Sequence, residues 1–265
     1  MTTINVLDHG YVKLIDTMGN DETIIEAARM STGKGFQGWG PKEDGKPGDE
    51  KLLAFLWENQ HTTPFEMCEL ALEVQAPIMV FREWHRHRTQ SYNEFSARYE
   101  KMPDLHYLPA PERVQKQSTS NKQGSAEPMQ GANSYRAGWE KEQKMVFDAY
   151  EQAIEDGMAK EVARLNCPVS RYSKMRVKAN LLNWFRFLGL RMAPNAQWEI
   201  RQYANAVASI VKSWCPRSYA LFEEHTLYGV RLSRSQVAAL IPPPTGAMND
   251  AEKAVWKKLQ RATEL

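Results

Sequence analysis

Residues 67–88 read MCELALEVQAPIMVFREWHRHR, and this stretch decides the fold that we expect for the chain. Polar and apolar side chains alternate over residues 67–76, which predicts a half-buried strand. Pro77 suits the first turn of a helix, and a helix over residues 78–87 is expected from one apolar stripe, made by Ile78, Phe81 and Trp84. The stretch therefore predicts a strand that passes directly into a helix.

Upstream of this stretch, the pattern predicts one more strand and two helices. Residues 4–15 have the composition of a strand, and Asp21 is expected to cap a helix over residues 22–31. A glycine- and proline-rich loop then ends at Asp49, a second expected helix cap. The helix expected next, residues 50–60, has one apolar face, formed by Leu52, Leu53, Leu56 and Trp57.

Downstream, residues 110–135 are polar and have no apolar stripe, so we expect a mobile surface insertion there. Beyond the insertion the chain is strongly helical, with helices expected at residues 136–157, 174–190, 195–213, 217–228 and 249–262. Strands early and helices late predict an α+β fold, in which a small, mostly antiparallel sheet packs with several helices. Because we expect one site to need residues from both sides of the insertion, we predict a single domain over residues 1–265.

The bulk composition is that of a soluble globular protein. The chain has 265 residues, of which 42% are hydrophobic and 25% charged. Its net charge of +2 is too small for a general nucleic-acid binder. No apolar run approaches the roughly 20 residues that span a bilayer, and the N-terminus has no apolar signal core. We therefore expect a cytoplasmic protein.

The cysteines and histidines give no pattern typical of a nucleophile or a metal site. Cys68, Cys167 and Cys215 lie far apart, with no Cys-x-x-Cys pair. Cys167 and Cys215 each precede a proline without a neighbouring histidine, so we interpret both as core residues. His85 and His87 would point to divergent faces of a helix and have no third ligand at a recognisable spacing. We expect no metal site.

The segment at the end of the predicted helix concentrates ionisable groups. The triplet Arg86-His87-Arg88 falls at the helix's C-terminal end, and residues 89–98, expected to be a loop, add Glu94, Ser96 and Arg98. Adjacent cations repel one another, whereas the planar donor fork of arginine fits phosphate oxygens. A solvated basic patch is one interpretation. The nearby acceptor, hydroxyl and further fork favour the other, a site for a phosphorylated small molecule. Since no Gly-x-Ser-x-Gly elbow surrounds Ser96, its assigned role is hydrogen bonding.

Two further elements are ambiguous when each is taken alone. The segment at residues 61–66, His-Thr-Thr-Pro-Phe-Glu, has two interpretations. It is either a purely structural turn bent by Pro64, or it holds a hydroxyl and an imidazole rigidly beside a ligand. Residues 172–176 form a short basic element around Lys174, which is either a solvated patch or part of an anion site.

A fourth element surrounds the start of the helix expected at residues 195–213. Asn195 is a good helix cap, and the free donors of such a helix end favour an anion. Arg191 and Arg201 flank it, so the segment is a second candidate site for an anion or a heterocycle. The alternative is an ordinary capped helix with exposed charges.

Three of these motifs, in this order, resemble the flavin-dependent thymidylate synthases, a family that makes dTMP without a cysteine nucleophile. The family signature, Arg-His-Arg followed by Ser, is met by Arg86-His87-Arg88 and Ser96. The upstream His-x-Thr/Ser-Pro-Phe-Glu turn is met by residues 61–66, and the downstream Leu-Arg…Ala-Gln-x-Glu-Ile-Arg segment by residues 190–201. The resemblance covers nearly the whole chain apart from residues 110–135 and the C-terminal tail.

The resemblance implies an enzyme that binds FAD and dUMP and uses NADPH and methylenetetrahydrofolate as co-substrates. It places FAD against Thr63, Arg86, His87, Arg88, Glu94, Arg191 and Asn195. It places dUMP against Glu83, Arg86, Glu94, Ser96, Ala97, Arg98, Lys174 and Arg201. Ser96 and Arg201 are the implied catalytic residues. In the family this arginine favours ionisation at N3 of the uracil, which makes C5 nucleophilic.

Three positions depart from the family pattern. Glu83 stands where glutamine is common, which brings a carboxylate closer to the nucleotide phosphate than expected. Ala97 replaces a frequent glycine and narrows the backbone options of its loop. Lys174 replaces a common arginine, so a point charge stands in for a bidentate fork. These departures bear on substrate affinity rather than on the reaction class.

The resemblance also implies a homotetramer with active sites at subunit interfaces, and two other functions are left to weigh. A conventional thymidylate synthase needs a thiolate within Pro-Cys-His, whereas the order here is Cys167-Pro168-Val169. A non-catalytic nucleotide- or RNA-binding protein would use the basic segment of residues 86–98.

Overall fold

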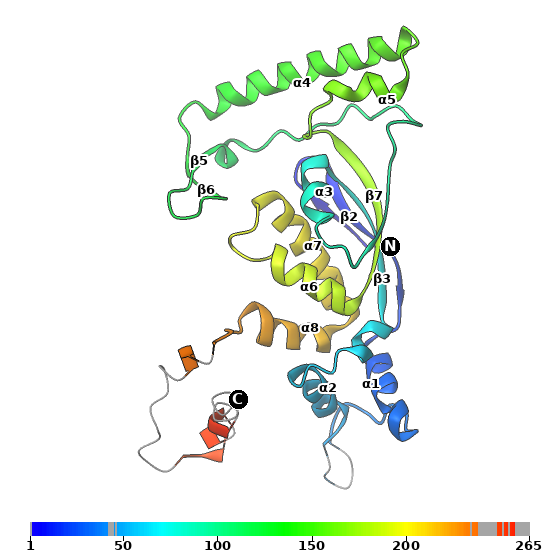
Figure 1. Ribbon diagram of the computed structural model, residues 1–265, viewed down its shortest axis with the longest axis vertical. Coiled ribbons are helices and arrows are strands. Elements are labelled where there is room, and N and C mark those ends of the chain that lie inside the picture. Colours follow the sequence, from blue (N-terminus) through cyan, green and yellow to red (C-terminus); the bar gives the residue numbers. More distant parts are fainter. Residues whose placement is uncertain are drawn as a thin grey trace. The chain divides into compact units, whose positions relative to one another are not determined.

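The computed structural model describes residues 2–41, 45, 47–233, 235–237, 248–250, 252, 253 and 255–257. The chain divides into two compact units, Met1–Phe222 and Glu223–Leu265. The first unit holds the sheet and the long helices, and Figure 1 shows their arrangement. The expectation of one domain over the whole chain stays a prediction.

The centre of the first unit is a five-stranded sheet with the strand order β1-β2-β3-β7-β4, in which every neighbouring pair is antiparallel. The strands are β1 Thr3–Val6, β2 Gly10–Met18, β3 Glu69–Pro77, β7 Tyr172–Asn180 and β4 Ser91–Glu94. This sheet and the helices around it confirm the α+β class, and β3 confirms the strand predicted for the stretch that precedes the triplet.

The helices and short turns follow in chain order. They are α1 Asp21–Arg29, η1 Met30–Thr32, α2 Asp49–Glu58, η2 Thr63–Met67, α3 Ile78–Trp84, η3 Pro111–Arg113, α4 Ala132–Glu155, α5 Lys160–Ala163, η4 Arg164–Asn166, α6 Leu181–Arg191, α7 Trp198–Trp214 and α8 Pro216–Phe222. In the second unit, Glu223–Leu227 form a π-helical turn, η5. Half of the helix expected at residues 249–262, including all of residues 258–262, lies outside the described residues. Among the helices that are described, none has the length and apolarity that crossing a membrane requires.

One strand expected at residues 4–15 is in fact the hairpin of β1 and β2, which turns at Leu7–His9. The turn depends on Gly10, which lies against the Tyr203 ring hydroxyl, so that a Cβ at this position would overlap that oxygen. Only glycine fits such a close approach. The prediction was wrong because the alternation of the two arms reads as one strand when the turn is not recognised.

A second difference concerns residues 174–180, which were expected to start a helix and instead belong to β7. Buried and exposed side chains alternate along this strand, with Met175, Val177 and Ala179 buried. A period of two is the period of a strand, so the alternation was a strand signal. The helix begins only at Leu181, where the Asn180 side chain accepts the Asn183 backbone N–H at 2.9 Å.

The sheet has one apolar face, and α3, α6 and α7 pack on it. Leu70, Leu72, Val74 and Ala76 of β3 are fully buried on this side. Between α3 and α6, Trp84 packs on Phe187 with ring centroids 4.5 Å apart, and both contact Trp184. Aromatic rings bury large areas, so this cluster fixes the end of α3 just before the triplet.

Two aspartates expected as helix caps have another role. Asn20 caps α1 and Gly48 caps α2, whereas Asp21 and Asp49 lie one residue further on and are buried. Asp21 accepts hydrogen bonds from the start of α8, namely from the backbone N–H of Arg217 at 2.9 Å, and from the N–H and hydroxyl of Ser218 at 3.0 and 2.6 Å. The carboxylate therefore caps a helix nearly 200 residues away, which local sequence cannot indicate.

We predict that Asp21→Ala destabilises the protein by about 1–3 kcal/mol, because the α8 donors lose their acceptor. Asp21→Asn keeps one acceptor oxygen and should retain part of the stability. Urea unfolding followed by circular dichroism measures the effect, with Glu22→Ala, an exposed first-turn neighbour, as the control. An Asp21→Ala protein as stable as the control would contradict this role.

Candidate functional site

The triplet lies in the turn that follows α3 and is held there by β4. The carbonyl of His87 accepts the Tyr92 hydroxyl at 2.5 Å, and the Trp84 indole donates to the Gln90 side chain at 2.9 Å. Burial raises the pKa of Tyr92 to about 12, so the hydroxyl stays a donor. Residues 89–98 were expected to be a loop. The strand β4 within them pairs with the edge of β7, which supplies the ladder that the local sequence does not reveal.

His87 is neutral and bound to Arg191. The Arg191 Nε donates to His87 Nε2 at 2.9 Å. Because a guanidinium only donates, Nε2 is the acceptor and the imidazole proton lies on Nδ1. Burial, followed by the Arg191 charge, lowers the pKa of His87 to about 4. The centre of the triplet is therefore an uncharged ring with a fixed tautomer.

Glu83 is paired with the same arginine. The Arg191 Nη1 donates to the Glu83 carboxylate at 2.8 Å, and Nη2 donates to the Glu83 backbone carbonyl at 2.8 Å. The sequence placed this carboxylate near the nucleotide phosphate. The structure gives it a cationic partner within the chain, so its charge is compensated.

Arg86 and Arg88 are exposed and have no side-chain hydrogen bond or ion pair to any residue that the structure describes. Lys174 on β7 is equally exposed and equally without such a partner. Its neighbours on the same face differ, because Arg176 pairs with Glu73 at 3.0 Å and Lys178 pairs with Glu69 at 2.7 Å. Unpaired guanidinium and ammonium groups are suited to phosphate oxygens.

Glu94 is the last residue of β4, and the loop that follows begins beside Lys174 and contains Ser96. The Phe95 N–H donates to the Lys174 carbonyl at 2.8 Å, and the Glu94 side chain is exposed without a partner among the described residues. The Ser96 hydroxyl accepts the Arg98 N–H at 3.3 Å, and its carbonyl accepts the N–H of Tyr99 at 3.0 Å. Ser96 thus shapes a tight turn. Within the described part of the chain, its hydroxyl has no hydrogen bond to a side chain that could act as a general base.

Two other residues of this loop face α4 and α5. Ala97 is buried in a cluster with Met102, Phe147 and Tyr150. Its methyl group therefore has a packing role that the usual glycine would lack. Arg98 donates from Nε to Glu161 at 3.1 Å, and both side chains are about half exposed. A ligand could compete for Arg98, since such exposed pairs contribute little stability.

Arg201 lies in the first turn of α7. Its Nη1 donates to the Pro194 carbonyl at 3.2 Å. It lines a cavity of about 470 Å³ whose other wall is the segment Glu112–Ala126. Asn195 was expected to cap this helix, but the cap position is held by Gln197, and Asn195 is exposed. The helix cap therefore lies two residues later in the chain than the sequence predicted.

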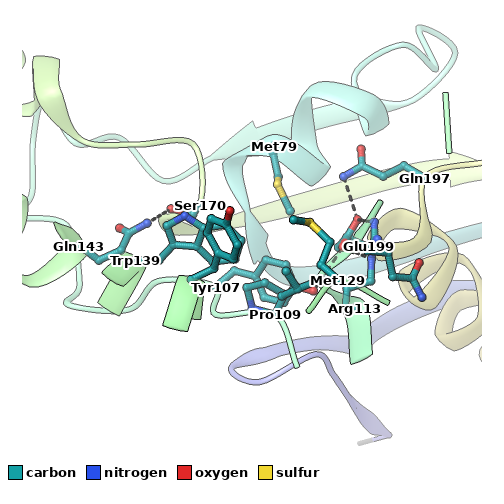
Figure 2. Close-up of a pocket in the computed structure, with 13 residues that line it drawn as sticks. Met79, Tyr107, Pro109, Arg113, Met129, Trp139, Gln143, Ser170, Gln197 and Glu199 are labelled. Atoms are coloured by element: carbon teal, nitrogen blue, oxygen red, sulfur yellow. Dashed lines mark hydrogen bonds and ion pairs between the residues drawn. The ribbon is translucent and has the colours of Figure 1, made fainter. Parts of the chain in front are cut away.

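A larger cavity of about 630 Å³ lies beside it, and Figure 2 shows its lining. Gln143 of α4 donates to Ser170 at one end, Met79 and Met129 lie in the middle, and Glu199 of α7 lies at the other end. None of the residues predicted to hold FAD or dUMP, all of which the structure describes, lines this cavity. Thr63, at the exposed start of η2, likewise makes no contact with the triplet among the described interactions.

The sequence did not predict the ion pair of Arg113 and Glu199. Arg113 lines both cavities, and Glu199 lines the larger one. Arg113 donates to the buried Glu199 carboxylate from Nε at 2.8 Å and from Nη2 at 3.3 Å. Tyr107 and Gln197 donate to the same carboxylate, and burial raises the pKa of Tyr107 above its usual range. The pair spans 86 residues, so no local pattern could have linked its members.

Arg113 also helps to order residues 110–135. They were expected to be an irregular mobile insertion and instead form η3, the hairpin of β5 Gln115–Gln117 and β6 Ser125–Pro128, and the start of α4. Arg113 binds Ser125 of this hairpin at 2.7 Å while it binds Glu199 of α7. The Arg113 guanidinium therefore links the hairpin to α7.

The sequence and the fold are similar to those of known proteins. Residues 13–217 match the family model described as thymidylate synthase complementing protein. Flavin-dependent thymidylate synthases from Wolbachia pipientis and Thermus thermophilus are 42% and 44% identical, over 87% and 90% of this chain and 79% and 84% of their own. A crystal structure of the UMP/dUMP methylase PolB from Streptomyces cacaoi, bound with 5-Br dUMP, superposes with a TM-score of 0.74 at 26% identity, covering 84% of this chain and 98% of that one.

We predict that Arg113→Ala frees the hairpin, since it removes both contacts and leaves Glu199 buried without its cation. The expected loss of stability is about 2–4 kcal/mol. Amide hydrogen exchange should accelerate in residues 115–128 before it does so in the sheet. Lys116→Ala is the matched control, because its contact with Glu127 is exposed and 3.8 Å long. Equal protection of the hairpin in the two variants would show that Arg113 is not its anchor.

Proposed function

The chain belongs to the family of flavin-dependent thymidylate synthases, and we propose that it converts dUMP to dTMP by reductive methylation. Methylenetetrahydrofolate is the carbon donor and NADPH-reduced FAD is the hydride donor. The observation that carries this assignment is the set of cations Arg86, Arg88 and Lys174, unpaired within the described residues, beside the exposed carboxylate Glu94. Phosphates need such cations, and a pyrimidine nucleotide also needs hydrogen-bond acceptors.

The side chains around the triplet fit FAD. Arg86 and Arg88 present exposed guanidinium forks, which suit a diphosphate, on either side of the neutral His87 ring. We assign FAD binding to Thr63, Arg86, His87, Arg88, Glu94 and Asn195 directly, and to Arg191 through its hydrogen bond with His87. When bound and reduced by NADPH, the flavin would supply the hydride of this chemistry. The protein's part is to bind it, orient it and exclude water.

The nucleotide is assigned to the neighbouring loop and strand. We assign dUMP binding to Arg86, Glu94, Ser96, Ala97, Arg98, Lys174 and Arg201 directly, and to Glu83 through its ion pair with Arg191. Lys174 and Arg98 offer charge for the phosphate, and the Ser96 hydroxyl offers a positioning hydrogen bond. Arg201 would face the uracil, where a fixed cation stabilises negative charge on the ring and makes C5 nucleophilic.

The cysteines support a mechanism without a thiolate. Cys68 and Cys215 are fully buried, and Cys167 is partly buried. Burial raises the pKa of Cys167, and a hydrogen bond with Cys68 together with burial raises the pKa of Cys215. Raised pKa values leave these thiols protonated and poorly nucleophilic. This argues against the conventional thymidylate synthase as the alternative.

A homotetramer with active sites between subunits completes the proposal. Arg201 lines the smaller of the two cavities described above, and the triplet lines neither of them. Residues from neighbouring subunits would bring the two sets together around one dUMP. We also infer a cytoplasmic enzyme that uses free NADPH and folate and does not bind nucleic acid, given the net charge of +2.

The absorption spectrum of the purified chain tests the function. We expect a yellow protein with flavin bands that NADPH bleaches and air restores. A non-catalytic nucleotide- or RNA-binding protein, the alternative function, would be colourless and would not oxidise NADPH. Absence of flavin binding at any added FAD concentration would refute the proposal.

We predict that Arg201→Ala still binds FAD but loses methyl transfer by about 10²–10³-fold, because the fixed cation acts on the uracil charge. Release of tritium from [5-³H]dUMP, with the flavin spectrum as the check on FAD binding, measures both. Arg186→Ala removes an exposed arginine whose described partner is Asn183, and this control should be fully active. Full activity of Arg201→Ala would place the uracil-facing cation elsewhere.

A further inference from the structure

The guanidinium of Arg191, from α6, binds the C-terminal end of α3 and the turn that follows it. Each nitrogen of Arg191 donates within the chain, to His87 Nε2 at 2.9 Å, to the Glu83 carboxylate at 2.8 Å and to the Glu83 carbonyl at 2.8 Å. The arginine side chain is only 16% exposed. Its donors are therefore turned toward the protein rather than toward a ligand.

The contact of Arg191 with the Glu83 backbone carbonyl caps the C-terminal end of α3. This carbonyl lies in the last turn of α3, where the helix itself offers no N–H donor. Arg191 supplies that donor and puts a positive charge at the helix's C-terminal end, where the helix dipole favours it. The same group thus caps α3 and neutralises the Glu83 carboxylate.

The contact with His87 fixes the turn itself. The His87 ring packs edge-on against Phe187 with centroids 4.9 Å apart, and its carbonyl accepts the Tyr92 hydroxyl. With Arg191 on Nε2, both the ring and the backbone of His87 are held. Arg86 and Arg88 flank this fixed residue, so their exposed forks start from a defined backbone.

We propose that Glu83 and Arg191 are positioning residues that act on FAD and dUMP only through His87 and the turn after α3. Glu83 does not face the nucleotide phosphate. It orients Arg191, which holds His87 as the Nδ1–H tautomer and presents Arg86 and Arg88 in a preformed arrangement. A carboxylate is tolerated in place of the family's glutamine because the Arg191 charge compensates it. This inference deepens the proposed function and rests on it for the ligands alone.

A double-mutant cycle tests whether Glu83 works through Arg191. Dissociation constants for FAD and dUMP are measured on the full-length oligomer for Glu83→Ala, Arg191→Gln and the double variant. We expect about tenfold weaker binding in each single variant and no further loss in the double variant, since both remove the same arrangement. Independent, multiplying effects would overturn the proposal.

The conservative substitution separates positioning from repulsion. Glu83→Gln keeps an acceptor for Arg191, so it should restore most of the binding lost in Glu83→Ala. If Glu83 instead faced the phosphate, removing its charge would make Glu83→Gln bind dUMP several-fold more tightly than the native chain. That result would also overturn the proposal. Asp148→Ala, which breaks the exposed pair of Asp148 and Lys144 on α4, is the control for loss of a paired carboxylate.

A ligand-free measurement keeps this inference distinct from the proposed function. In ¹⁵N-labelled protein without FAD, long-range NMR correlations should show His87 as the neutral Nδ1–H tautomer at pH 6. In Glu83→Ala and Arg191→Gln, the Nε2–H tautomer should appear, and it should recede again in Glu83→Gln. An unchanged His87 signal in folded Glu83→Ala would refute the positioning role. Failure of the native chain to bind FAD would refute the function and leave this result standing.

Discussion

The pairing of β3 with β7 is the constraint on which the rest of the structure depends. Its register runs from Glu69 opposite Asn180 to Pro77 opposite Tyr172. Because the pair is antiparallel, α3 leaves one end of the ladder and α6 leaves the other. A nine-residue strand is about 30 Å long, and the two helices, of 7 and 11 residues, run for about 10 and 16 Å. Their far ends therefore meet, which is why Arg191 reaches Glu83 and His87.

The same strand pairing also decides which cations of β7 have an anionic partner. Arg176 and Lys178 of β7 find Glu73 and Glu69 across the strand pair, whereas Lys174 stands at the position opposite Gln75. Cross-strand partners thus compensate two cations and leave the third available next to β4. Together with Arg86 and Arg88, Lys174 gives local positive charge to a chain whose net charge is only +2. A small anionic ligand is the partner that such a local excess favours.

Long-range contacts explain where sequence reasoning failed. Asp21 caps α8, Arg113 binds Glu199, and Arg98 pairs with Glu161, each across more than 60 residues. Such side chains carry no local signal of their partner. Residues 110–135 looked like an insertion without structure for the same reason, since their hairpin is held by Arg113 rather than by an apolar stripe of its own. Asn195 was misjudged by two residues because cap preference is a weak guide to where a helix begins.

The sequence by itself determined the strand that passes into α3, the α+β class, and the family, because alternation, helical spacing and three ordered motifs are local patterns. It also identified the triplet, Ser96 and Arg201 as the residues to examine. Only the tertiary structure decided which charges stay available. Arg191 is engaged with Glu83 and His87, while Arg86, Arg88 and Lys174 keep exposed side chains. The physical reason is that a charge is compensated by whatever the fold brings within hydrogen-bonding distance, and residues 108 positions apart meet only once the sheet has formed.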